Sequence, residues 1–187
     1  FQFNTSVTYV PVDSANYYVL DATNKYNCYK DIPANLLNSY GLIIDKDNKQ
    51  YDLKFIQTVA PSRNVVFINA DIKPNGKMEG TAQISSFSYN KFNNVENYKV
   101  NGEKKYTEHL INGDNNLKIT SLKFDNMNVD SLPLMQNIAF NLDLTGSDEN
   151  YTYFKPNMFT SLGPNPFLSE NRFTDIDFGY RDNYVIT

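Results

Sequence analysis

The sequence predicts a mainly β protein, α+β at most, built as an antiparallel sheet or a β-sandwich with one or two short helices. The chain has 13 Phe and 14 Tyr but only 8 Gly among its 187 residues, and aromatic residues favour strands. Segments of alternating or β-branched residues recur along much of its length. The three-four spacing of apolar residues that a helix requires is confined to residues 90–112.

The first two predicted strands form a hairpin. Residues 6–12 and 17–20 are β-branched and aromatic runs with turn-forming residues between them. After the hairpin, Pro33 suits the first position of a single helical turn within residues 32–37, because the amide hydrogen that proline lacks has no helical partner there. Residues 41–44 then predict a short strand.

Strand patterns resume in the middle of the chain. Residues 51–59 alternate imperfectly, which predicts a strand covered on both faces. Residues 64–72 and 78–89 flank Asn75 and Gly76. This dipeptide supplies the positive φ angles of a tight turn, so the sequence predicts a long hairpin here.

The helical region and two further strands follow. Asn101 and Gly102 interrupt the helical period of residues 90–112, so we expect two short helices. Strands return over residues 117–124 and 138–144. The second of these strands has one apolar and one polar face, which is typical of a half-exposed antiparallel strand.

The chain from Pro156 onward lacks regular periodicity. We expect it to wrap over the sheet as an ordered clasp, held by buried rings and by ion pairs between Arg172 and neighbouring acids. Alternatively, the rings are exposed and form a platform for a sugar or a peptide. The rings in question are Phe159, Phe167, Phe173 and Phe178.

Charge and composition exclude some classes of function. A net charge of -4 and a pI near 5.0 give an average field that repels phosphate, so nucleic acid is not an expected partner. No apolar run approaches the roughly 20 residues that span a bilayer, so no transmembrane segment is expected in this chain. The single cysteine, Cys28, has no partner for a disulfide, and no cofactor or metal is predicted.

Two groups of polar residues are candidates for a site. The lone histidine, His109, falls in the second predicted helix and is interpreted as a partly buried or solvated helix residue rather than a ligand or base. Asp45, Asp47, Asn48 and Asp52 invite a calcium loop but lack its central Gly and terminal Glu. We therefore interpret them as a polar hairpin turn.

The sequence Leu-Asp-Ala-Thr at residues 20–23 resembles the end of a transglutaminase-like core, a papain-like arrangement with Cys, His and Asp in that order. The resemblance implies that Asp21 matches the Asp that orients the imidazole. The matching His position, after a Phe-Asn pair, holds Thr5, which cannot act as a general base. Cys28 follows the Asp and so does not match the nucleophile. We expect no catalytic residue here and interpret Asp21 as a cap of the following turn.

Two later segments extend this resemblance along the chain. They are Asn-Pro-Phe at residues 165–167, followed by a charged stretch and Arg172, and the Asp-Phe-Gly-Tyr signature within residues 174–180. Together they resemble bacterial transglutaminase-like proteins flanked by domains of unknown function. The resemblance implies that residues 1–45 are the tail of the core, a hairpin and linker, and that residues 46–187 are a β-rich domain of unknown function.

The expected role follows from this resemblance. We expect a non-catalytic structural or interaction domain of a larger exported bacterial protein, in the periplasm or at the cell surface. Its expected partner is the rest of the parent chain, and a cell-envelope protein or a glycan is a further candidate. One alternative is that the parent is an active thiol hydrolase or acyltransferase to which this segment contributes only Asp21. Another is a carbohydrate- or peptide-binding module.

Overall fold

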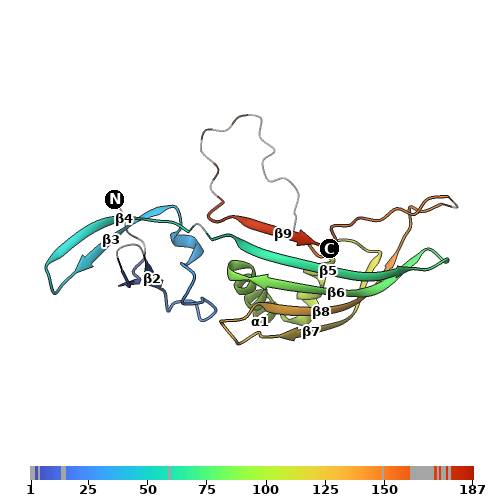
Figure 1. Ribbon diagram of the computed structural model, residues 1–187, viewed down its shortest axis with the longest axis horizontal. Coiled ribbons are helices and arrows are strands. Elements are labelled where there is room, and N and C mark those ends of the chain that lie inside the picture. The colour runs from blue at the N-terminus through green and yellow to red at the C-terminus, as the bar shows by residue number, and fades with distance from the viewer. Residues whose placement is uncertain are drawn as a thin grey trace. The chain divides into compact units, whose positions relative to one another are not determined.

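The computed structural model describes the whole chain except residues 1–2, 4, 14–15, 59, 149, 161–170, 172, 174–175 and 177. Of the described residues, 41% lie in strands and 16% in helices, which confirms the predicted mainly β fold (Figure 1). The chain divides into two compact units: unit 1 contains Phe1–Ser62 and Arg172–Asp182, and unit 2 contains Arg63–Asn171 and Asn183–Thr187.

The division after Ser62 differs from the boundary expected at residue 45. The reason is a hairpin whose strands pair on both sides of that residue, from Ser39 with Ile56 to Asp45 with Gln50. A boundary at residue 45 would separate two strands that are hydrogen-bonded along their whole length, so the division falls after the second strand.

Unit 1 is built from two antiparallel hairpins and one short helical turn. The predicted first hairpin and helical turn are both present, although Pro33 caps the turn instead of occupying its first position. The elements are β1 (Thr8–Pro11), β2 (Tyr17–Leu20), η1 (Ala34–Leu36), β3 (Ser39–Asp45) and β4 (Gln50–Ile56).

The two hairpins of unit 1 share a small apolar core. Among the described residues its buried members are Val19, Leu36 and Ile56. Gly41 leaves room for Ile56, because a Cβ at Gly41 would lie 2.9 Å from the Cδ1 atom of that side chain. The Lys54 ammonium lies 4.4 Å from the centre of the Tyr17 ring and so links β4 to β2. Few side chains are therefore available to stabilise unit 1.

Unit 2 contains a five-stranded sheet with strand order β7-β8-β6-β5-β9 (Figure 1). The predicted turn at Asn75 and Gly76 joins β5 to β6, and Gly76 has the expected positive φ of 73°. Asn75 does not have the positive φ that was also expected of it. The elements are β5 (Ser62–Ile72), β6 (Lys77–Phe87), α1 (Ser88–Ile111), β7 (Leu117–Asp125), β8 (Leu134–Asp143) and β9 (Asp182–Ile186).

The fifth strand departs from the antiparallel pattern. The amide of Thr187 donates to the carbonyl of Val66 at 2.9 Å, and the amide of Ile68 donates to the carbonyl of Thr187 at 2.8 Å. In a parallel pair, one residue bonds through its amide and its carbonyl to the two residues that flank the residue opposite it, as Thr187 does here. β9 therefore runs parallel to β5, while β5, β6, β8 and β7 pair antiparallel.

The helix α1 is divided as predicted. Gly102 has φ 79° and ψ 169°, which are not helical values, so two helical segments lie on either side of it. The element ends at Asn112, whose left-handed φ of 50° and amide bonds to the carbonyls of Glu108 and His109 close the last turn.

The core of unit 2 lies between α1 and one face of the sheet. β8 shows why: every second residue, from Leu134 to Leu142, is buried, and the residues between them are more accessible. Tyr106 of α1 is fully buried against this face. The predicted apolar and polar faces of this strand are thus confirmed.

The aromatic residues after Pro156 behave differently from one another. Phe159 is buried and packs edge-on against Phe140, with ring centroids 5.3 Å apart. Phe173 is 97% exposed and Phe178 is 72% exposed, so the expected burial of these two rings is wrong. Both rings lie in segments without regular structure, where nothing in the local pattern determines burial. Phe167 and Arg172 lie outside the described residues.

Candidate functional site

Asp21 lies directly after β2 and bonds within its own turn. Its Oδ1 atom accepts hydrogen bonds from the Thr23 amide at 2.9 Å and from the Thr23 hydroxyl at 2.7 Å. These two bonds, that of the hydroxyl first, lower the pKa of the Asp21 carboxyl below its ordinary value. Asp21 therefore has the geometry of a turn cap.

Within unit 1, the described residues bring no Cys or His side chain into a hydrogen bond with Asp21. Thr5 is exposed and precedes β1, and within the described residues no hydrogen bond joins it to Asp21. Cys28 is half-buried in the loop after β2. The predicted helix position of His109 is confirmed: it is exposed on α1, in unit 2. The described hydrogen bonds of Asp21 are therefore with Thr23, and with neither Thr5 nor Cys28.

Asp45, Asp47 and Asn48 form the predicted polar turn between β3 and β4, whereas Asp52 lies within β4 and pairs with Ile43. Asp45 Oδ1 accepts hydrogen bonds from the amides of Asp47 at 3.1 Å and Asn48 at 3.0 Å, and its Oδ2 accepts one from the Asn48 side chain at 2.8 Å. The Asn48 side chain is the main cause of a lowered pKa at Asp45. Across the described residues, no three His, Cys, Asp or Glu side chains are grouped so that they could hold a metal.

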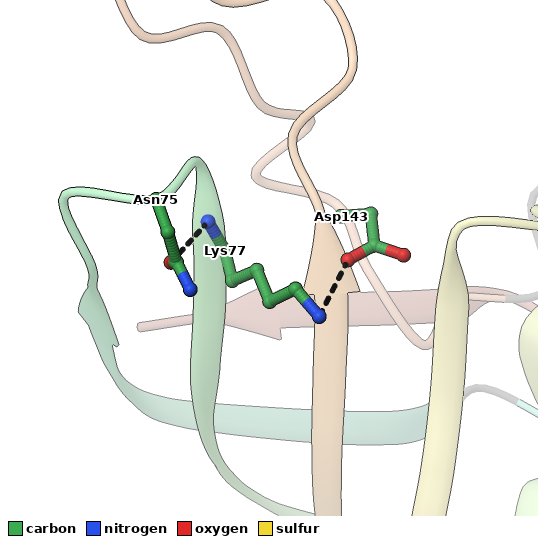
Figure 2. Close-up of polar contacts among 3 residues, drawn as sticks. All are labelled: Asn75, Lys77 and Asp143. Carbon is green, nitrogen blue, oxygen red and sulfur yellow. Dashed lines mark hydrogen bonds and ion pairs between the residues drawn. The ribbon is translucent and has the colours of Figure 1, made fainter.

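A shallow surface depression lies beside the β5–β6 turn and the end of β8. Figure 2 shows its polar contacts: Lys77 Nζ lies 3.7 Å from a carboxylate oxygen of Asp143, and the Lys77 amide donates to Asn75 Oδ1. Both charged side chains are about half exposed, and such a pair contributes only about 0.2–1 kcal/mol. These contacts fasten the end of the sheet and create no reactive group.

The most unusual surface of the described chain is apolar and lies on the β3–β4 hairpin. We call it the hairpin face: three cross-strand pairs project from the same side of the two strands. They are Tyr40 with Phe55, Leu42 with Leu53, and Ile44 with Tyr51. All six side chains are exposed, from 38% at Leu42 to 81% at Tyr51.

The opposite side of this hairpin holds Gly41, Lys54 and Ile56, which face the core of unit 1. The prediction of a strand covered on both faces is therefore wrong for β4. The alternation in residues 51–55 indicated that one side of this strand is apolar. It did not indicate that the apolar side of β3 lies next to it, because periodicity does not show which side of a strand is buried.

A second apolar surface lies on the β1–β2 hairpin. Val10, Tyr18 and Leu20 point away from the core side that holds Val19, and they are 36%, 38% and 37% exposed. Tyr29 is 52% exposed and its ring centroid lies 6.0 Å from that of Tyr18. We call these four residues the outer face of β1–β2.

Comparison with known proteins adds no relative. No family model matches the chain, and neither a curated protein nor a solved structure gives a significant match. Among the described residues no helix combines the length and the apolar character that crossing a membrane requires. The fold and surface define the class as a two-unit, mainly β chain with exposed apolar hairpin faces.

Proposed function

We propose that this chain is a non-catalytic interaction module of a larger exported, transglutaminase-like protein. In this proposal the outer face of β1–β2 packs against the rest of that protein. The observation that carries it is the exposure of Val10, Tyr18, Leu20 and Tyr29 on a hairpin whose other side is already in a core. Contiguous apolar surface of this kind is typical of interaction sites.

The small core of unit 1 gives this face a physical reason to be covered. An isolated two-stranded hairpin is marginally stable in water. The exposed fractions of the four side chains correspond to on the order of 300 Å² of surface, which gives an upper value of roughly 7 kcal/mol if all of it were buried. That gain would be comparable to the whole stability of a typical domain, about 5–15 kcal/mol.

The geometry of Asp21 favours the non-catalytic role. Its carboxylate is engaged by Thr23 in the turn that follows β2, and Thr5 cannot supply a general base. The location in the periplasm or at the cell surface rests on the resemblance of residues 20–23 and of the C-terminal motifs to exported bacterial proteins.

The binding part of the proposal is tested by mixing this chain with the separately expressed remainder of its parent and measuring affinity by calorimetry. We expect binding that Tyr18→Ser with Leu20→Ser weakens at least about tenfold, because two apolar contacts are lost. The matched control is Tyr40→Ser, on the other hairpin. Absence of binding, or equal affinity of all three proteins, would contradict the proposal.

The non-catalytic part is tested by assays of amine incorporation and peptide hydrolysis. We expect no activity above background from the chain or from its Cys28→Ala variant. Activity that disappears in Cys28→Ala would overturn this part. In the parent protein, loss of a measurable activity on Asp21→Ala would favour the alternative in which this segment contributes the orienting carboxylate.

The exposed rings of Phe173 and Phe178 favour a second candidate, a module that binds a glycan or a peptide. Aromatic rings stack on the apolar faces of sugars and on other side chains. Calorimetric titration with soluble cell-wall glycan fragments and with peptides tests it. Binding that is lost in Phe173→Ala with Phe178→Ala supports this candidate, and no heat of binding in the unmodified chain removes it.

A further inference from the structure

The hairpin face is two-stranded and apolar along its whole length. Each strand contributes three alternate side chains, and the cross-strand register places them in three rows. β3 and β4 form a two-stranded ribbon (Figure 1), and residues 46–49 join them. The Tyr40 and Phe55 rings contact each other at 5.1 Å between centroids, so one end of the face is a preformed aromatic pair.

The exposed area of this face reaches the size of an interface. Tyr51, Ile44, Tyr40 and Leu53 are 81%, 64%, 63% and 60% exposed, and Phe55 and Leu42 are 40% and 38% exposed. These fractions correspond to about 700 Å² for side chains of this size. The largest apolar patch of a typical monomer is about 300–600 Å². Two such faces together would bury about 1,400 Å², within the standard range for stable protein–protein interfaces.

The charges around the face do not oppose contact between two copies. Residues 39–56 contain three Asp (Asp45, Asp47, Asp52) and three Lys (Lys46, Lys49, Lys54), so this hairpin has no net charge although the whole chain carries -4. A strongly charged partner would find no complementary field here, whereas a second hairpin of the same sequence would meet no net repulsion.

The order of the rows is also self-complementary. The leucine pair Leu42 and Leu53 is central, with the aromatic pair on one side and Ile44 with Tyr51 on the other. In an isologous dimer, a twofold axis that crosses the strands near the leucines would bring the Tyr40 and Phe55 end of one copy against the Ile44 and Tyr51 end of the other. The aromatic and aliphatic side chains would then interdigitate as in packed sheets.

We infer that the hairpin face is a self-association surface, through which two copies of this chain form a twofold dimer. This inference concerns a different hairpin from the one in the proposed function. Either can therefore fail while the other holds.

Sedimentation equilibrium of the full chain over a wide range of concentration tests the inference. We expect a monomer–dimer equilibrium whose dissociation constant rises at least about 100-fold in Tyr51→Ser with Leu53→Asn, because one central contact and one flanking contact are lost. The matched control is Phe67→Ser, which changes a residue that is 54% exposed on β5 of unit 2 and should leave the dimer intact. Near-UV circular dichroism checks that each variant is folded.

A second pair, Tyr40→Ser with Ile44→Ser, keeps the test decisive if the first variant does not fold. A monomeric wild-type chain at all concentrations would overturn the inference. So would a dimer that survives both double variants, or one that is lost only in Tyr18→Ser with Leu20→Ser. A monomer that binds the remainder of the parent through the hairpin face would assign the face to that partner and overturn the inference as well.

Discussion

The hydroxyl of Tyr106 makes a buried hydrogen bond whose loss can be measured without removing the ring. It donates to Gln136 Oε1 at 2.6 Å, and both residues are buried, at 0% and 1% exposure. Gln136 Nε2 donates in turn to Ser86 Oγ at 3.4 Å. Tyr106→Phe removes the donor and keeps the ring contacts with Tyr98 and Phe124, so the Gln136 oxygen loses its partner.

The expected cost follows from that unsatisfied oxygen. A buried acceptor left without a donor costs about 1–3 kcal/mol, so we expect Tyr106→Phe to lower the free energy of unfolding of unit 2 by about 2 kcal/mol. Full truncation, Tyr106→Ala, also removes the buried ring and should cost about 3–5 kcal/mol. Replacing both hydrogen-bond partners with apolar groups destabilises a protein much less than leaving one of them buried without a partner. Tyr106→Phe with Gln136→Met should therefore recover part of the loss.

Urea denaturation followed by near-UV circular dichroism measures these changes, since the chain contains no Trp but 14 Tyr. We expect a lower midpoint for Tyr106→Phe with an unchanged dependence on urea. The control is Tyr98→Phe, a half-buried residue of the same aromatic cluster. Equal midpoints for Tyr106→Phe and Tyr98→Phe would refute the reasoning.

Three further predictions concern stability. Burial raises the pKa of Tyr106 above its ordinary value near 10. The stabilising contribution of the neutral Tyr106 side chain is therefore complete below about pH 10 and is lost as the pH rises further. The urea midpoint should fall more steeply above this pH in the wild-type chain than in Tyr106→Phe. A Cβ at Gly80 would clash with the Asn69 carbonyl and the Ala70 side chain, so Gly80→Ala should lower the urea midpoint by more than Gly76→Ala at the open turn does. Phe159→Ala should lower the free energy of unfolding by about 3–5 kcal/mol. Phe178→Ala changes an exposed ring and should lower it by less than about 1 kcal/mol. Similar melting temperatures for the two variants would contradict the burial difference.

Local signals in the sequence were sufficient for most of the strands and for the helix. Gly76 predicted the β5–β6 turn because glycine readily adopts the positive φ found there, and Gly102 predicted the interruption of α1 for the same reason. Asp21 was correctly interpreted as a turn cap, since an Asp beside Thr at a strand end can bond to the next turn.

Features that depend on distant contacts were not predicted. The parallel pairing of β9 with β5 joins residues that are far apart in the sequence, and no local pattern specifies which strand is the neighbour of another or in which direction it runs. The exposure of Phe173 and the hairpin face were missed because hydrophobicity does not say whether anything covers a side chain. Pairing and burial are decided by topology, which a single sequence specifies only indirectly.

The parallel strand β9 also determines the order in which unit 2 can be completed. The hairpins β5–β6 and β7–β8 join neighbouring segments and can close soon after they leave the ribosome. Thr187 is made much later than its partners Val66 and Ile68. Until then the outer backbone groups of β5 stay open, and an open strand edge can pair with another chain. Between the synthesis of β5 and that of β9, a nascent chain therefore carries this additional open edge.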